Sequence, residues 1–487
     1  SSHFSVRKQM DKTAAKDAKG EHALQLLRQP DTSTLATLTV LELKGIGLAE
    51  LPPSLAQCQQ LAKLEISANP NLQSLPDVIA SLPELRILFA SGIGLVEIPP
   101  SFALCPKLSM LGLKDNRLAT VNGNNLPESL VWLIAAGNQI ESLPGLGRLR
   151  HVRKLMLSNN RLTAEALRPV AEIEDLEMLR VAANRLEGLP DALLQHPKLA
   201  WVAIGSNPFT EATMDSILSK APNTLEAAYS EVTRGDRLGS GAGATVYKAS
   251  WTGKDVALKL WESENFSDGT AHGEWAANRV AGDPGHSALV RVHGVFKEPL
   301  GMIMELLVEA VQAASPPSFS TVTRDNLRAT GGSGPVYTPQ GAFRVALSVA
   351  KACEYLRTKG LHHGDVYLHN TLVVCTASGD TADAGMHVND VRLTDFGAAA
   401  TAPEPCFSAL EKLEVRCFGW LVQDLLESSV APSAADDEAV LESMKKVREL
   451  CGNVSVEQVP RFKEVVASLT EALPQRTSIG AIPPSTL

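Results

Sequence analysis

A period of 22 to 24 residues runs through the first half of the chain and constrains its fold more than any other feature. Each unit opens with LxxLxLxxN or a close variant, as in residues 108–118 (LSMLGLKDNRL). Units of this length cannot bury an apolar face alone, so neighbouring units must stack into one continuous core. We therefore predict a solenoid whose leucines point inward and whose LxL pieces are short parallel strands. The eight units begin at Leu38, Leu61, Leu85, Leu108, Leu130, Val152, Leu176 and Leu199.

Most units carry an asparagine where the chain turns out of the strand, and its side chain can satisfy backbone groups there. The first and third units carry Ile46 and Ile93 instead, so we predict looser turns at these positions. The pattern resembles that of leucine-rich-repeat proteins, and residues 21–30 have the helical spacing of a cap over the first repeat. The asparagines are Asn69, Asn116, Asn138, Asn160, Asn184 and Asn207.

Large apolar side chains flank the core leucines in several consecutive units. Solvated strand positions do not usually collect Trp, Phe and Met in adjacent rungs, and a contiguous apolar patch marks a contact surface. We predict a protein-binding stripe whose occupant is another protein or the second half of this chain. The alternative is that each side chain is half covered by its neighbours. The residues are Ile87, Phe89, Met110, Trp132, Ile134, Met156, Met178 and Trp201.

The composition is that of an ordinary globular protein, with 44% apolar and 20% charged residues among 487. A formal charge of -9 argues against nucleic acid as a partner, because phosphate backbones require a basic surface. The seven cysteines are scattered without a CxxC pair, which disfavours a disulfide framework or a zinc site and favours a cytoplasmic location. No apolar run reaches the ~18 residues of a membrane-spanning helix, so we expect no membrane partner.

The repeat signal stops after residue 213, and short strand-like runs followed by helical stretches begin near residue 236. We predict an α/β repeat solenoid followed by an α+β domain with a β-rich small lobe and a helical large lobe. The expected parts are an N-terminal helical cap or tail (1–34), the solenoid (35–222), a linker (223–234), the two-lobed domain (235–475) and a C-terminal tail (476–487).

Residues 238–249 (LGSGAGATVYKA) place Gly239, Gly241 and Gly243 between two strand-like runs. Glycines allow backbone N–H groups to approach a phosphate closely. A plain hairpin with a glycine turn is the alternative. A dinucleotide-binding fold is disfavoured because a strand and not a helix follows.

Lys259 ends the strand-like run VALK (256–259), and Glu274 lies in a helical stretch further on. A glutamate on a packed helix can hold such a lysine so that its ammonium group meets phosphates. Taken singly, each residue could equally be a solvated side chain.

Residues 361–373 carry Asp365 and Asn370 in a loop between apolar runs, and residues 393–399 carry Asp395. A carboxylate can accept the proton of an attacking hydroxyl, and carboxylate and amide oxygens are ligands of Mg²⁺. Phosphoryl transfer requires charge neutralisation and alignment more than covalent chemistry. A glycine loop, a lysine and these ligands would suffice for it.

In this order and at these spacings, the motifs resemble those of the protein-kinase family over residues 235–475. The resemblance implies a bilobal protein-kinase-like domain with ATP and Mg²⁺ as cofactors. It implies the catalytic residues Asp365, Lys259, Glu274 and Asn370, and the metal ligands Asn370 and Asp395. Residues 304–307 (MELL) are similar to the hinge. The implied ATP-contacting residues are Leu238, Gly239, Ser240, Gly241, Gly243, Val246, Ala257, Lys259, Met304, Glu305 and Leu307.

The whole chain resembles soluble bacterial-type leucine-rich-repeat kinases, with Gly364 and Tyr367 where many kinases carry arginine and lysine. Without that arginine, control by an activation-loop phosphate is expected to be absent. The activation segment is short, and whether Ala402-Pro403-Glu404 is its conserved end, paired with Arg461, stays open. The stretch 329–341 is expected to be a mobile insertion.

Three functions are compatible with these motifs. The first is a protein kinase acting on serine or threonine more readily than tyrosine, with the repeats recruiting partners or regulating the domain. The second is a small-molecule hydroxyl kinase, because a short activation segment needs no peptide platform. The third is a pseudokinase scaffold, because retained residues do not prove turnover.

Overall fold

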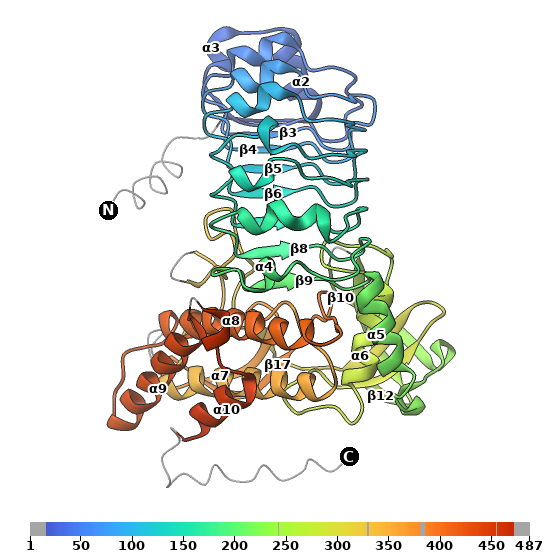
Figure 1. Ribbon diagram of the computed structural model, residues 1–487, viewed down its shortest axis with the longest axis vertical. Helices are drawn as coiled ribbons and strands as arrows, with labels where there is room; N and C mark the ends of the chain where they lie inside the picture. Colours follow the sequence, from blue (N-terminus) through green and yellow to red (C-terminus); the bar gives the residue numbers. More distant parts are fainter. Residues whose placement is uncertain (1–15, 242, 329–330, 380–384, 454, 472–487) are drawn as a thin grey trace. The chain divides into compact units, whose positions relative to one another are not determined.

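The computed structural model describes residues 16–241, 243–328, 331–379, 385–453 and 455–471, which form two compact units that divide between Leu193 and Leu194 (Figure 1). The division falls inside the predicted solenoid, so the eighth repeat groups with the second unit. The predicted C-terminal tail (476–487) and residues 1–15 of the predicted cap lie outside the described residues.

The first unit is a stack of short parallel strands in sequence order. Two helices near its start, α2 (Gly20–Arg28) and α3 (Thr32–Leu35), include the predicted cap. One strand, β1, was not expected; it precedes the first repeat and pairs with β2. The strands are β1 (Lys16–Lys19), β2 (Leu38–Glu42), β3 (Lys63–Glu65), β4 (Ile87–Phe89), β5 (Met110–Gly112), β6 (Trp132–Ile134), β7 (Lys154–Met156) and β8 (Met178–Arg180).

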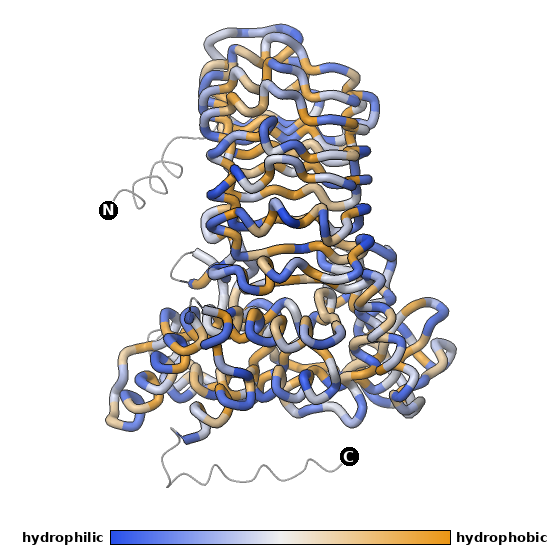
Figure 2. The backbone as a smooth tube through the Cα atoms, viewed as in Figure 1, coloured by the Kyte–Doolittle hydropathy of each residue, from blue (hydrophilic) through white to orange (hydrophobic). Residues whose placement is uncertain are grey.

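Short 3-10 helices lie between most of these strands, and apolar segments recur in each coil (Figure 2). Leucines at the repeat positions, such as Leu88, Leu111 and Leu133, are fully buried in one continuous core. The 3-10 helices are η1 (Pro53–Gln57), η2 (Asp77–Ser81), η3 (Pro100–Leu104), η4 (Gly123–Asn125), η5 (Leu146–Arg148) and η6 (Glu165–Glu172).

Each repeat asparagine ties its own turn to the preceding one. The Nδ2 of Asn116 donates to the carbonyls of Leu113 (3.0 Å) and Ala90 (2.9 Å). Its Oδ1 accepts from the backbone N–H groups of Ile93 (3.1 Å) and Leu95 (3.0 Å). The turn at Ile93, which we predicted to be looser, is thus hydrogen-bonded by the asparagine of the next repeat.

The predicted apolar stripe is only partly exposed. Met110, Met156, Met178 and Trp201 are 6%, 8%, 1% and 1% exposed, so the prediction of exposure is wrong for these four residues. Trp132 is half-buried, and the Nζ of Lys154 lies 4.1 Å from its ring centroid. Half-buried positions remain on β4 and β6, at Ile87, Phe89, Trp132 and Ile134.

The small lobe of the second unit is a five-stranded antiparallel sheet in the order β10-β11-β12-β14-β13. Helix α6 (Ala271–Ala281) packs against it through Trp275 in a shared apolar core. The strands are β10 (Val232–Ser240), β11 (Ala244–Trp251), β12 (Lys254–Trp261), β13 (Val292–Phe296) and β14 (Gly301–Glu305).

The large lobe is helical, with a three-stranded antiparallel sheet of β15 (Val311–Gln312), β16 (Thr371–Ala377) and β17 (Met386–Leu393). Phe418 and Phe462 meet edge to face in its core, with ring centroids 5.9 Å apart. The helices are α7 (Pro339–Thr358), α8 (Cys406–Glu427), α9 (Ala435–Cys451) and α10 (Phe462–Glu471). Among the described residues, no helix has both the length and the apolar character of a membrane span.

The stretch 329–341 is not a mobile insertion in its described part, and residues 329–330 lie outside the described residues. Tyr337 is fully buried, and its hydroxyl donates to the carbonyl of Ala313 (3.1 Å). Thr338 then caps α7, with its Oγ1 accepting from the N–H of Gly341 (3.1 Å), and Pro339 takes the first helical position. Pro339 and Gly341, which suggested a loop, serve the start of a helix, whereas residues 331–336 do form a loop.

Repeat-encoded elements begin the second unit. Helix α4 (Asp191–Leu194) spans the division, strand β9 (Trp201–Ala203) is the strand of the eighth repeat, and α5 (Pro208–Leu218) follows it. Asn207 and Thr210 form a capping box at the start of α5. Short 3-10 turns, η7 (Asn223–Leu225) and η8 (Tyr229–Glu231), lead into β10.

Candidate active site

A cavity of about 360 Å³ opens where the glycine-containing hairpin, β12, α6 and the loops around β16 and β17 meet. This volume is within the range of small-molecule pockets. Ten residues that we predicted from sequence line it: Gly239, Ser240, Gly241, Gly243, Val246, Lys259, Glu274, Met304, Asn370 and Asp395. The other predicted site residues, Leu238, Ala257, Glu305, Leu307 and Asp365, are not among its lining.

Lys259 lies near the end of β12, and its ammonium group pairs with the carboxylate of Glu274 on α6. The other carboxylate oxygen of Glu274 accepts from the indole N–H of Trp261 (2.8 Å). Burial alone would lower the pKa of Lys259, but the nearby carboxylates of Glu274 and Asp395 raise it above its usual value. The cavity therefore holds a fixed cation beside Asp395.

The glycine-containing hairpin forms one wall. The N–H of Gly241 donates to the carbonyl of Ala244 (2.9 Å), which closes the turn, and Ala242 lies outside the described residues. A side chain at Gly243 would come within 2.8 Å of the ring of Phe266, whereas Gly239 and Gly241 have open space. Leu238 is 53% exposed. Open space above glycines allows a ligand to approach the backbone closely.

Asp365 and Asn370 belong to the loop that precedes β16. The Nδ2 of Asn370 donates to both the backbone carbonyl (2.9 Å) and the Oδ2 (3.0 Å) of Asp365. The backbone N–H of Gly364 donates to the Oε1 of Glu414 on α8 (2.7 Å). These bonds fix the loop, hereafter the catalytic loop (residues 361–370), in one conformation.

Asp395 follows β17 and has a left-handed backbone conformation, with φ of 65°. Its Oδ1 accepts from the N–H of Gly397 (3.2 Å). The ring of the next residue, Phe396, is buried against His363 of the catalytic loop, with centroids 5.2 Å apart. A left-handed conformation is costly for a residue other than glycine, so the packing of Phe396 holds Asp395 in place.

The donor set suits a hard divalent cation. Asp395 and Asn370 line the same cavity, and no described residue donates a hydrogen bond to the Oδ1 of Asn370. Carboxylate and amide oxygens are preferred ligands of Mg²⁺, which usually completes its shell with water and phosphate oxygens.

The residues predicted to form the hinge differ in whether their side chains line the cavity. Met304 lines the cavity and is paired across the sheet with Ala257. The side chain of Glu305 instead accepts from Arg392 (2.9 Å) and from the backbone N–H of Arg291 (2.8 Å). The backbone N–H of Glu305 also donates to the carbonyl of Arg291 (2.9 Å), so neither this group nor the side chain is free for the role that the resemblance implies.

Sequence reasoning missed several lining residues, of which His369 is the most informative. Its Nδ1 lies 2.6 Å from the Oδ1 of Asp325. Burial would lower the pKa of His369, but Asp325 and, less strongly, Asp365 and Asp395 raise it. The sequence feature that could have identified His369 is its place directly before Asn370. The other missed residues are Trp261, Phe266, Asp268, Asn278, Val290, Met302, Gln312, Thr394, Phe396 and Gly397.

The activation segment is short and covered. Residues 398–402 are all at most 5% exposed. Glu404 bonds to Ser408 (Oγ to Oε1, 2.9 Å), while the backbone N–H of Arg461 donates to Glu464 (2.8 Å). The pairing of Glu404 with Arg461 is therefore not formed. Glu411 takes the buried position instead, next to Arg357 (2.6 Å).

Comparison with known proteins matches residues 232–413 to the family model described as protein kinase domain. Similar solved structures include a leucine-rich-repeat protein of Leptospira interrogans, at 23% identity and a TM-score of 0.33, over 39% of this chain and 53% of that chain. Internalin C2 of Listeria monocytogenes is 20% identical, with a TM-score of 0.32, over 36% of this chain and 75% of that chain. The chain thus spans about half the length of the Leptospira protein. At such TM-scores neither likeness carries an argument, and no curated protein matches.

Proposed function

The chain combines a leucine-rich-repeat array with a protein-kinase-like domain, and from this premise we propose that it is an ATP-dependent protein kinase. It transfers the γ-phosphoryl group to a protein hydroxyl, of serine or threonine more readily than tyrosine. One observation carries the proposal: Lys259, Asn370 and Asp395, far apart in sequence, line one cavity. Nucleotide phosphates need such a set of a cation, metal ligands and a glycine-containing turn.

The residues divide the work as follows. Lys259, held by Glu274, neutralises the phosphates. Asp395 and Asn370 would hold Mg²⁺, which would supply charge neutralisation to the phosphates. Asp365, fixed by Asn370, orients the acceptor hydroxyl and accepts its proton. The backbone of the glycine hairpin covers the phosphates, and Met304 borders the adenine.

The repeat array is proposed to recruit the protein substrate. Half-buried Ile87 on β4 and Trp132 on β6 flank Met110 on β5, and half-buried Phe89 pairs with Gly112 on the same strand. Changing Phe89 or Trp132 to Asp in the full chain should raise the KM for the protein substrate and leave the KM for ATP unchanged. Unchanged KM for both substrates would remove this role. None of the seven cysteines, all of which are described, forms a disulfide, which supports a cytoplasmic location.

A second candidate, a pseudokinase scaffold, is favoured by the covered activation segment and by Asp365, which is 8% exposed. A peptide acceptor needs an accessible platform, and a hydroxyl must reach this carboxylate. The short segment also keeps a small-molecule hydroxyl acceptor open. These alternatives differ in whether labelled phosphate reaches protein, a small molecule or neither.

The test uses the full chain with γ-labelled ATP, Mg²⁺ and a generic protein acceptor. Lys259→Met and Asp395→Ala should each lower transfer by about 100-fold or more, because each removes a fixed charge on the phosphates. Lys254→Met and Asp255→Ala, at exposed positions of the same strand as Lys259, are matched controls and should retain activity. Chelation of Mg²⁺ should abolish transfer.

Equal transfer by wild type and Asp395→Ala would exclude this site as the source of activity. ATP binding in a thermal-shift assay without any transfer would favour the scaffold. Label recovered in a small-molecule fraction and not in protein would favour a small-molecule hydroxyl kinase.

A further inference from the structure

The strand of the eighth repeat contacts the catalytic loop directly. The rings of Trp201 on β9 and Tyr367 in the loop are stacked, with centroids 4.9 Å apart and planes 8° from parallel. Both are almost fully buried, at 1% and 2% exposure. The hydroxyl of Tyr367 donates to the carbonyl of Thr323 (2.7 Å), so the ring is fixed at both ends. Stacked aromatic pairs contribute beyond the area they bury.

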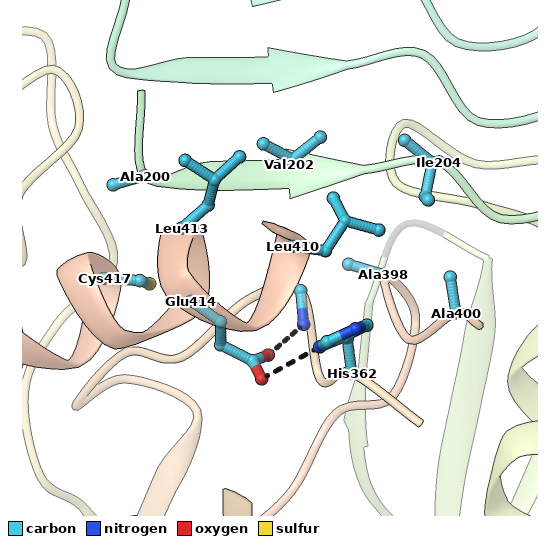
Figure 3. Close-up of a pocket in the computed structure, with 11 residues that line it drawn as sticks. Ala200, Val202, Ile204, His362, Ala398, Ala400, Leu410, Leu413, Glu414 and Cys417 are labelled. Carbon is cyan, nitrogen blue, oxygen red and sulfur yellow. Dashed lines mark hydrogen bonds and ion pairs between the residues drawn. The ribbon is translucent and has the colours of Figure 1, made fainter. Parts of the chain in front are cut away.

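The same strand packs along α8. Figure 3 shows Val202 on β9 facing Leu410 and Leu413 on α8, and the pocket that these residues and Ile204 line has a volume of only about 20 Å³. Such a small gap indicates close packing.

A buried arginine joins the preceding segment to the same helix. Arg416 on α8 donates to the carbonyls of His196 (2.6 Å) and Leu199 (3.3 Å). Burial lowers the pKa of Arg416 to about 10. Breaking these bonds would leave buried polar groups without partners, which is costly.

This packing accounts for the glycine in the catalytic loop. Gly364 has φ of 74°, and an added Cβ would lie 2.5 Å from the carbonyl oxygen of Ala398 and 3.2 Å from that of Val202. An arginine, which we noted as the usual residue here, would have no room. The backbones of β9 and the activation segment occupy the space around this position.

The turn after β9 also reaches the small lobe. The Oγ of Ser206 lies 2.7 Å from the Oγ1 of Thr270. Thr270 is the N-cap of α6, and its Oγ1 accepts from the N–H of Gly273 (3.0 Å). Helix α6 carries Glu274, the partner of Lys259.

We propose that Trp201 is a positioning residue for phosphoryl transfer and that residues 196–207, although encoded as a repeat, fix both the catalytic loop and α6. Trp201 acts through Tyr367, two residues after Asp365, and Ser206 acts through Thr270. Residues 196–207 thus position the catalytic loop in this chain, where an arginine and an activation-loop phosphate would otherwise control it. Only the expected change in kcat rests on the proposed function; the positioning of the loop and of α6 does not.

The first test compares Trp201→Ala, Trp201→Leu and Trp201→Phe in the full chain. Trp201 is not among the residues that line the nucleotide cavity. We therefore expect Trp201→Ala and Trp201→Leu to lower kcat by about 10-fold or more at an unchanged KM for ATP, because small misplacements of catalytic groups are costly. Trp201→Phe should restore most of kcat, because the Nε1 of Trp201 has no hydrogen-bond partner in the described chain.

Trp251→Ala, which removes an indole from β11, is the control for loss of a tryptophan and should keep kcat. Trp201→Leu retains an apolar side chain, so it separates loss of stacking from loss of folding. Full kcat in Trp201→Leu would overturn the proposal, as would an equal loss in Trp201→Phe.

Hydrogen exchange gives a readout that does not need activity. Amides of the catalytic loop should exchange about 10-fold faster in Trp201→Leu than in wild type, and those at the start of α6 faster in Ser206→Ala. Unchanged exchange in both would overturn the proposal. A wild type that transfers no phosphate would defeat the proposed function, while the exchange comparison would still decide whether Trp201 positions the loop.

Discussion

The two units use asparagine in different ways. In the repeat array the same contacts recur: Asn138 donates to Leu113 and Ala135, and Asn160 donates to Ala135 and Leu157. In the second unit, Asn370 bonds to Asp365 and faces a cavity. The recurring contacts are equivalent and stabilise the stack, whereas the contacts around the cavity are made by different residues with different roles. Loss of a repeat asparagine should therefore cost stability, and loss of Asn370 should cost function.

Replacing these two asparagines gives the largest expected effects. Asn138→Ala leaves several buried backbone groups unpaired and should lower the free energy of unfolding by about 2–4 kcal/mol. Under the proposed function, Asn370→Ala should lower phosphate transfer by about 100-fold, because the proposed metal ligand and the hydrogen-bond partner of Asp365 are lost together. Chemical denaturation measures the free energy of unfolding of both variants, and transfer assays measure their phosphate transfer.

The contrast requires that Asn138→Ala keep the function of the second unit and that Asn370→Ala keep the stability of the repeat array. Nucleotide binding by Asn138→Ala should match wild type, and the unfolding midpoint of the repeat array should be unchanged in Asn370→Ala. A loss of nucleotide binding in Asn138→Ala would mean that the two units are not independent in this respect.

Two glycines, one in each unit, provide a second comparison, for which we expect intermediate effects on the free energy of unfolding. Gly47 in the array and Gly364 in the catalytic loop have φ of 72° and 74°, but a Cβ on Gly47 would have nothing within 4 Å. Gly47→Ala should cost about 1–2 kcal/mol from backbone strain alone. Gly364→Ala adds overlap with two carbonyl oxygens and should cost about 3 kcal/mol or more. Denaturation curves test this order, and equal costs would contradict the tight packing at Gly364.

The pH dependence of stability should have opposite signs at two aspartates. Burial raises the pKa of Asp424 on α8 to about 7, although Arg324 opposes the shift. Its folded-state pKa lies above the unfolded value of 3.8, so its contribution favours folding at low pH and is lost as pH rises from about 4 to 7. Hydrogen bonds from Thr34 and Ser33 lower the pKa of Asp31, so its contribution is present above the unfolded pKa and is lost as pH falls.

The measurement is the free energy of unfolding of wild type and Asp424→Asn between pH 4 and 7.5, and of wild type and Asp31→Asn as the pH falls from 4 through the range below 3.8. Relative to wild type, Asp424→Asn should gain stability as pH rises from about 4 to 7.5, by a few kcal/mol at most. The smaller difference for Asp31→Asn should have the opposite slope. A flat difference for Asp424→Asn would show that Arg324 keeps this carboxylate ionised throughout.

Local patterns predicted the repeat array closely, because each strand is set by residues within its own unit. Strands β2 to β9 fall in the eight predicted units. Around the cavity, the motif residues Lys259, Asn370 and Asp395 were also predictable from the sequence, because their spacing follows a known order. Phe266 and Gln312 were not, because nothing in their neighbourhood distinguishes them from ordinary core or surface residues.

The stretch 329–341 shows how local composition misleads. Its glycines and prolines are typical of a loop, but its second half is mostly buried, and Tyr337 ties it to the large lobe. Likewise, strand β1 has no repeat consensus and forms because β2 offers it an edge.

By itself the sequence determined a stack of leucine-rich units followed by a set of spaced motif residues, most of which line one cavity, because both are written as short periodic or spaced patterns. Only the tertiary structure decided that the last repeat belongs to the second unit and that its Trp201 stacks on Tyr367. The two residues are distant in the chain, and their contact depends on packing that no local pattern encodes. For the same reason the glycine at position 364 looked like a simple loss of arginine until the backbones around it were seen.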